Sequence, residues 1–272
     1  MLGENCFSHL GMPNRIWTVS AVHGELSKLQ SVHQAIGERF TLGDRVVYLG
    51  NYIGGLSNNS IEIIDEILSF RRSLLARPGM RVTDISYLRG MQEEMWQKLL
   101  QLQFAPNPLA TLEWMLEKGL KSTLESYGGS VKESLSVAPK GIMSITRWTN
   151  SLRQNMREYA GHEKFYSSLK RAAYTEDVKD GQNHLLFVNS GIDVSKSLME
   201  QGDSFWWAGK CFDDINHAYD PFSYVIRGYD PEQKGVHVNG VTMSLDGGCG
   251  YGGELVCAEI SGKGQVSSLL GA

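Results

Sequence analysis

Apolar and polar positions alternate with two different periods along the first third of the chain. Short runs rich in β-branched and aromatic residues at positions 16–19, 45–49 and 82–88 predict three strands. Between them, apolar residues recur every three to four positions across 26–36 and again across 61–75, which predicts two helices. The order strand, helix, strand, helix, strand favours parallel pairing with right-handed crossovers, and therefore an α/β fold.

Two of the expected helices begin at residues that favour helix starts. Asn59, followed three positions later by Glu62, resembles a capping box at the start of the second helix. Asn107 followed by Pro108 places a cap residue and a first-turn proline ahead of an amphipathic stretch in the middle of the chain. Helical character persists through about residues 91–180, so we expect a helical insertion or cap there rather than an independent domain.

The last third of the chain is rich in strand signals. Apolar runs at 184–188, 223–228, 235–246 and 254–260 predict strands, and Asn239-Gly240 predicts a tight turn that divides the third run into a hairpin. No repeat or linker interrupts the pattern. We therefore expect residues 1–272 to form a single domain.

Composition narrows the functional classes. With 272 residues, of which 42% are hydrophobic, the chain can bury a sizeable core. Its 26 basic and 30 acidic residues are well mixed and give a net charge of −4, which argues against nucleic-acid and anionic-membrane partners. No apolar run approaches the roughly 18 residues of a spanning helix, and the N-terminus lacks a signal-peptide pattern, so we expect a cytoplasmic protein. Four cysteines without a Cys-x-x-Cys pair argue against a thiolate zinc site and a disulfide framework.

Six glycine-containing segments coincide with strand ends in a fixed order. They read "SAVHGELSKL", "LGNYIGGLSNNSIEIIDEIL", "LRGMQEEM", "LFVNSGI", "IRGYDPE" and "SLDGGCGYGGELVCAEI". Their order, spacing and hydrophobic flanks resemble the calcineurin-like metallophosphoesterases, whose loops read GD-x-HG, GD-x-x-DRG, GNHE, VH-x-G and GHT. Within that superfamily the chain is most similar to bacterial diadenosine tetraphosphatases and Ser/Thr protein phosphatases. The resemblance implies a four-layer αββα sandwich with a helical cap.

The positions that match the family's metal ligands carry unsuitable side chains. In the family, a carboxylate and the hydroxide that attacks phosphorus bridge two metal ions. The matched proton donor is Gln92, and the residues that match the orienting Asp and the phosphate-binding Arg are Gly54 and Gly55. The resemblance leaves one surviving ligand, His23, beside five replaced ones: Ala21, Asn51, Met91, Asn189 and Tyr229.

The missing carboxylates limit what this site can hold. Two unit charges about 4 Å apart interact by about 4 kcal/mol at an effective dielectric of about 20, so two dications repel by roughly 16 kcal/mol. Carboxylates and hydroxide offset this repulsion in an active enzyme, whereas the matched positions here supply no carboxylate. Neutral Asn is a weak ligand for a hard cation, and neutral Tyr hardly binds one. We therefore expect no metal cofactor and predict a pseudo-phosphatase that binds a protein partner or a small polar ligand.

An active metal-dependent phosphoesterase remains an alternative. It would use Mn²⁺ or another divalent metal at an atypical site, with phosphoproteins or dinucleoside polyphosphates as substrates. Glu93, Glu94, Asp84 and Asp230 could in principle rebuild a single-metal site, although only Glu93 matches a family position, and that position is structural. A purely structural subunit of a larger assembly is a third possibility.

The altered cleft could still bind a polar molecule. The side-chain amides of Asn51, Gln92 and Asn189 either line a pocket for such a ligand or satisfy one another and water. For the imidazole of His23 we expect an ordinary hydrogen bond at the junction of a strand and a helix, since one His does not hold a metal alone. The candidate pocket residues are His23, Asn51, Gln92, Asn189 and Tyr229.

Overall fold

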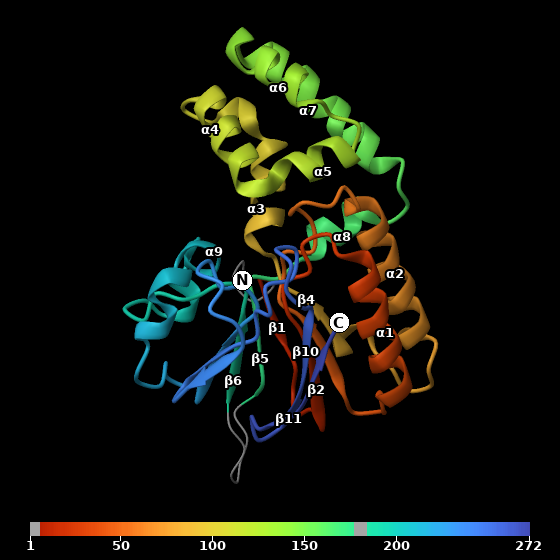
Figure 1. The fold of residues 1–272 in the computed structure, drawn as a ribbon, viewed down its shortest axis with the longest axis vertical. Coiled ribbons are helices and arrows are strands. Elements are labelled where there is room, and N and C mark those ends of the chain that lie inside the picture. The colour runs from red at the N-terminus through yellow and green to blue at the C-terminus, as the bar shows by residue number, and fades with distance from the viewer. Residues whose placement is uncertain (1–5, 177–183) are drawn as a thin grey trace.

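The computed structural model of the protein describes residues 6–176 and 184–272. Two mixed β-sheets lie face to face, helices cover their outer faces, and a group of helices stands above one end of the sheets (Figure 1). The expected four-layer α/β sandwich with a helical cap is therefore confirmed.

The first sheet has the strand order β11-β10-β2-β3-β4. Strands β2, β3 and β4, from the N-terminal third of the chain, pair in parallel, as their alternation with helices predicts. The C-terminal hairpin adds two antiparallel strands next to β2. The bounds are β2 Arg15–Val19, β3 Arg45–Tyr48, β4 Ile85–Tyr87, β10 Val256–Ser261 and β11 Val266–Gly271.

The second sheet has the strand order β1-β5-β6-β7-β9-β8. Its centre is parallel through β6, β7 and β9, whereas β5 pairs with β6 and β8 pairs with β9 in the antiparallel sense. The turn at Asn239-Gly240 joins β8 to β9, as expected. The bounds are β1 Phe7–His9, β5 Ala172–Tyr174, β6 Leu185–Val188, β7 Tyr224–Arg227, β8 His237–Asn239 and β9 Thr242–Ser244.

Both faces are buried at the central strands of each sheet, and successive residues there point to opposite sides. In the first sheet Val47 joins the cluster between the two sheets, whereas its neighbour Val46 joins the cluster under the outer helices. In the second sheet Phe187 and Ile226 face the first sheet, and Leu186 faces outward. Apolar residues on both faces explain why these strands read as continuous hydrophobic runs.

The two outer layers differ in thickness. Helices α1 (Leu26–Arg39) and α2 (Ser60–Leu75) pack side by side on the first sheet (Figure 1). The second sheet is covered by the short helix α9 (Ser204–Trp207) and the 3₁₀ segment Gly209–Asp214, through Phe205 and Phe212.

The helical segment begins at Met91 and ends at Ser168, which is short of the expected 91–180. The chain then enters β5, because Ala172 and Ala173 are needed as buried residues of the second sheet; residues 177–180 lie outside the described part. No helix in the described ranges is both long enough and apolar enough to span a membrane. The bounds are α3 Met91–Leu99, α4 Pro108–Met115, α5 Lys121–Ser126, α6 Val131–Val137, α7 Ile142–Arg157 and α8 His162–Ser168.

The two expected helix starts behave differently. Asn107 caps α4, since its Oδ1 accepts a hydrogen bond from Ala110 N at 3.2 Å. Asn59 precedes α2, but its side chain makes no cap; Nδ2 instead donates to Gly24 O at 3.3 Å. The capping-box prediction at Asn59 and Glu62 is therefore wrong, because the loop after β2 competes for the amide.

A steric prediction concerns a close approach between residues just after β7 and β3, at Gly228 and Leu49. A Cβ on Gly228 would collide with Leu49 Cβ, so Gly228→Ala should destabilise the fold by about 1–3 kcal/mol. Gly37, inside α1, is the control: its added Cβ would lie 3.8 Å from Phe70, and Gly37→Ala should stabilise by roughly 0.5–1 kcal/mol. Urea unfolding of the two variants checks this, and equal free energies would contradict it.

Candidate functional site

Loops that follow β2, β3, β6 and β7 meet at one end of the two sheets. Backbone N–H groups of Val22 and His23 donate to Asn51 O at 3.0 and 2.8 Å. Ala21 N donates to Gly228 O at 3.0 Å, and Tyr229 N donates to Asn189 O at 2.9 Å. The structure therefore brings together loops that are far apart in the sequence, as expected at the carboxyl ends of parallel strands.

A single buried carboxylate, Glu93 in the first turn of α3, holds this loop cluster in place. Oε1 accepts from Tyr52 N at 2.8 Å and Ile53 N at 3.2 Å, and Oε2 accepts from Asn51 N at 2.9 Å and Gly90 N at 2.8 Å. Burial raises the pKa of Glu93, and backbone N–H donors that include Ile53, Gly90 and Asn51 oppose that rise. Glu93 thus has the structural position that the family resemblance implies.

The amides at the matched ligand positions bind main-chain groups. Asn189 Nδ2 donates to Leu49 O at 2.7 Å, and Asn189 Oδ1 accepts from Met91 N at 3.2 Å. Asn51 Oδ1 accepts from Gln92 N at 3.1 Å. These bonds connect the loops after β3 and β6 to the start of α3, so the amides stabilise the loop cluster.

Gln92 connects the site to the helical cap. Its Nε2 donates to Lys118 O at 2.8 Å, in the π-helical segment Leu116–Leu120 between α4 and α5. Gly119 in that segment has φ 96°, and a Cβ there would lie 3.4 Å from Gln92 Nε2 and 3.5 Å from Gly55 N. The segment between α4 and α5 therefore contacts Gln92 in the first turn of α3 and the loop that holds Gly55.

The glycines at 54 and 55 also shape the site. Both have φ 82°, the left-handed region that favours glycine. A Cβ on Gly54 would collide with the Gln92 side chain, and a Cβ on Gly55 would lie 2.7 Å from His23 O. Gln92 thus occupies the space that any side chain at position 54 would need.

His23 is fully buried among aromatic rings. Its ring lies edge-on to Tyr229, with 5.4 Å between centroids, and edge-on to Tyr251 at 5.3 Å. Neither ring nitrogen has a hydrogen-bond partner in the described residues, so the expected ordinary hydrogen bond is wrong. Burial lowers the pKa of His23 to about 4, which keeps the ring neutral at physiological pH.

Two neighbouring groups are also held in their neutral forms. Burial raises the pKa of the Tyr229 phenol far above its usual value, so the phenolate that could bind a cation is inaccessible near pH 7. Cys249 Sγ donates to Val22 O at 3.2 Å, and burial raises the pKa of this thiol to about 12. Neither side chain is a ready nucleophile.

Several buried polar atoms around the matched ligand positions lack partners in the described chain. They are Nδ1 and Nε2 of His23, Nδ2 of Asn51 and Oε1 of Gln92. Each belongs to a side chain that is at most 1% exposed. An amide N–H donor, an amide oxygen and a neutral imidazole together offer both donors and acceptors to an uncharged polar group.

The donor set does not fit a pair of divalent metals. Ala21 has no donor atom, Met91 offers only a thioether, and the carboxamide oxygens of Asn51 and Asn189 already accept hydrogen bonds from backbone N–H groups. The unpartnered ligand atoms among the described residues here are the two ring nitrogens of His23 and the neutral carboxamide oxygen of Gln92. Within residues 6–176 and 184–272, no group of three His, Cys, Asp or Glu side chains is arranged to hold a metal.

The carboxylates considered for a replacement metal site have other partners. Asp84 pairs with Arg45 at 3.2 Å and accepts from Arg81 N. Glu94 pairs with Arg89 at 3.0 Å. Asp230 forms a fully buried ion pair with Arg227 at 2.9 Å. With Glu93 saturated by backbone donors, the four carboxylates serve separate structural contacts.

Comparison with known proteins supports the fold. No model of a known protein family matches the chain, and no curated protein matches its sequence. Among solved structures, a protein provisionally identified as a diadenosine tetraphosphatase is similar at 14% identity and a TM-score of 0.53, covering 97% of each chain. A protein serine/threonine phosphatase from Saccharomyces cerevisiae, with similarity to human phosphatase PP5, is similar at 11% identity and a TM-score of 0.53, covering 98% of this chain and 82% of the other. The chain therefore has the calcineurin-like metallophosphoesterase fold.

The structure brings the five candidate pocket residues together where the strand-end loops meet the first turn of α3. The sequence motifs did not predict three further residues at the site: Tyr251 and the cap residues Lys118 and Gly119. Tyr251 lies in the glycine-rich C-terminal loop, and the sequence indicated only that a loop is present there. The approach of the cap depends on tertiary packing, which local patterns do not encode.

Protonation of His23 gives a pH-dependent prediction. Because its folded pKa of about 4 lies below the ordinary value of 6.5, the unfolded chain takes up the proton first as the pH falls. The contribution of neutral, buried His23 to the free energy of unfolding is therefore fully present above about pH 6.5. It falls by roughly 3 kcal/mol as the pH drops from about 6.5 to about 4. Urea unfolding at pH 7, 5.5 and 4.5 should show a smaller loss for His23→Phe than for the unaltered protein.

The comparison isolates His23, because the other buried histidines with lowered pKa values, His33 and His162, are present in both proteins. Parallel stability curves for the two proteins would show that the His23 ring is protonated equally in the folded and unfolded states.

Proposed function

We propose that the protein is a catalytically inactive member of the metallophosphoesterase fold class that acts by binding. The observation that carries the proposal is the donor set at the matched ligand positions, which includes one imidazole and no carboxylate. Two dications at that spacing need anionic ligands to offset a repulsion of roughly 16 kcal/mol. Amides that already bond to backbone groups do not provide them.

The three chemical roles of the family's site all lack a group to perform them. Generation of the nucleophile would need the metal pair, and proton donation would need an acid where Gln92 stands. Binding of the transferred phosphoryl group would need a cation where Gly55 stands. The loss covers every step, which supports a binding role over slow hydrolysis.

A binding role also fits the local structure. The cap lies over Gln92 and Gly55, and the site offers neutral donors and acceptors with neutral aromatic rings beside them. An uncharged polar group suits such surroundings better than a phosphate, which needs charge-assisted bonds. A cytoplasmic location and the identity of a protein partner or small polar ligand stay predictions from the sequence.

Metal content tests the proposal. After incubation with Mn²⁺ and desalting, elemental analysis should find far less than one ion per chain in the unaltered protein. The double variant Ala21→Asp, Asn51→Asp is the matched control, since it places two carboxylates beside His23 and should retain measurably more Mn²⁺. Near-stoichiometric metal in the unaltered protein would overturn the proposal.

Hydrolysis provides a second test of the same proposal. With Mn²⁺ present, the protein should release no phosphate from p-nitrophenyl phosphate and should not cleave diadenosine tetraphosphate above the rate of a buffer blank. Turnover that Asn51→Ala abolishes, without unfolding the chain, would favour the alternative of an active phosphoesterase with an atypical site.

A further inference from the structure

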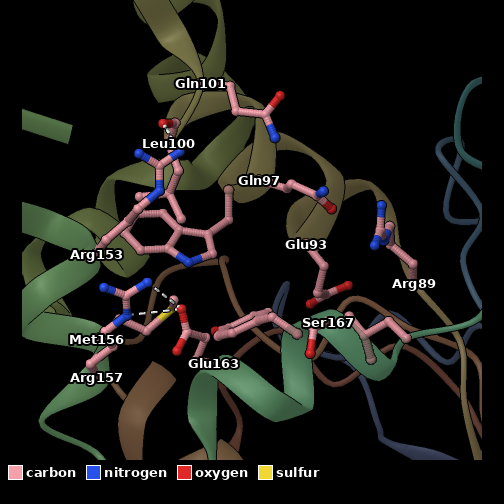
Figure 2. A pocket seen from close by; sticks show the side chains of 13 residues that line it. Arg89, Glu93, Gln97, Leu100, Gln101, Arg153, Met156, Arg157, Glu163 and Ser167 are labelled. Carbon is pink, nitrogen blue, oxygen red and sulfur yellow. Dashed lines mark hydrogen bonds and ion pairs between the residues drawn. The ribbon is translucent and has the colours of Figure 1, made fainter. Parts of the chain in front are cut away.

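A separate cavity lies between the first cap helix and the last two. It has a volume of about 210 Å³ and is lined from α3, α7 and α8 (Figure 2). None of the matched metal-ligand positions lines it. Its rim is exposed at Gln97, Arg157 and Ser167, whereas its floor is buried at Trp96 and Leu100. A buried apolar floor beneath a polar rim is the usual form of a small-molecule site.

The charges around the cavity are uneven. Its lining includes three guanidinium groups and two carboxylates. Arg157 pairs with Glu163 at 2.7 Å, and Arg89 pairs with Glu94 at 3.0 Å, so these two cations are compensated. The remaining cation is Arg153.

The guanidinium of Arg153 has N–H groups that make no hydrogen bond within the described residues. Its Nη1 donates to Asn150 Oδ1 at 3.1 Å, and its Nη2 donates to Leu100 O at 2.6 Å. Both acceptors are neutral, and within the described residues no carboxylate pairs with this guanidinium. Because a guanidinium carries five N–H donors, three are left for a ligand. The bonds to α7 and to Leu100 fix the group at the cavity wall before any ligand arrives.

The opposite carboxylate does not cancel this charge. Figure 2 shows Arg153 and Arg157 on one side of the cavity and Glu93 on the other. The charge of Glu93 is already met by the four backbone N–H donors of the loop cluster. The potential at the Arg153 side therefore favours an anion.

A second unsatisfied donor lies in the floor. Trp96 is 1% exposed and lines the cavity, and its Nε1–H has no acceptor in the described chain. The indole is held by stacking on Tyr127, with 5.2 Å between ring centroids. Tyr127 OH in turn lies 3.2 Å from the hydroxyl of Tyr166, another lining residue. A buried N–H without a partner costs stability, which a ligand acceptor would recover.

We propose that this cavity binds a small organic anion whose apolar ring packs on Trp96 and whose carboxylate or phosphate binds Arg153. Size sets the upper limit on the apolar part, because a cavity of about 150 Å³ holds benzene and this one is somewhat larger. One six-membered ring with one anionic substituent matches the volume. The proposal stands on a different cavity from the degenerate site and does not depend on the proposed function.

Benzoate is the probe, and its neutral isostere benzamide is the ligand control. In ¹H–¹⁵N spectra of the unaltered protein, benzoate should shift the Trp96 indole N–H resonance in a saturable manner, with the resonance assigned from Trp96→Phe. Benzamide has the same shape without the charge and should bind at least roughly tenfold more weakly, since charge-assisted bonds are about twice as strong as neutral ones. Raising the salt concentration should weaken benzoate alone.

Variants on one helix complete the test. Arg153→Met keeps the length of the side chain and removes the charge, and it should weaken benzoate binding roughly tenfold or more. Arg147→Met is the matched control, because Arg147 is exposed on the same helix and does not line the cavity; its affinity should not change.

Three results would each overturn the proposal. They are equal affinity for benzoate and benzamide, an unshifted Trp96 resonance at saturating probe, and unchanged affinity in a folded Arg153→Met protein. The first two use the unaltered chain, so they decide the question even if the variant fails to fold.

Discussion

The convergence of four backbone N–H groups on the buried carboxylate of Glu93 is the constraint on which the site depends. It ties the loop after β3 to the first turn of α3. In a metal enzyme of this fold, metal coordination would add to the same junction. In this chain the carboxylate of Glu93 accepts four backbone hydrogen bonds, so the junction between these segments is fully satisfied by protein groups.

Much of the fold was predictable from the sequence, because its strands and first two helices have strong periodic patterns and glycine-rich ends. The site could be located for the same reason. Parallel strands bring together the residues that follow them, which are His23, Asn51, Gln92, Asn189 and Tyr229. Placement of a side chain in a loop follows from topology, which the order of elements encodes.

What the sequence could not supply was the partner of each polar atom. The amide of Asn59 binds Gly24 O instead of capping α2, and the ring of His23 lies between two tyrosines without a hydrogen bond. Strands β1, β5 and β11 were missed because they are short or polar and depend on the neighbouring strand for their conformation. The contact between Gln92 and Lys118 joins segments whose packing no local pattern specifies.

The Gln92 side chain fills the space that a Cβ on Gly54 would enter, and this has an evolutionary consequence. A single mutation that introduced an acid at position 54 would meet both the Gln92 side chain and a left-handed backbone, so it would destabilise the loop. An acid at position 54 would therefore also require a smaller side chain at position 92. Positions 54 and 92 are therefore sterically coupled, and the residue at either position limits which side chains the other can accept.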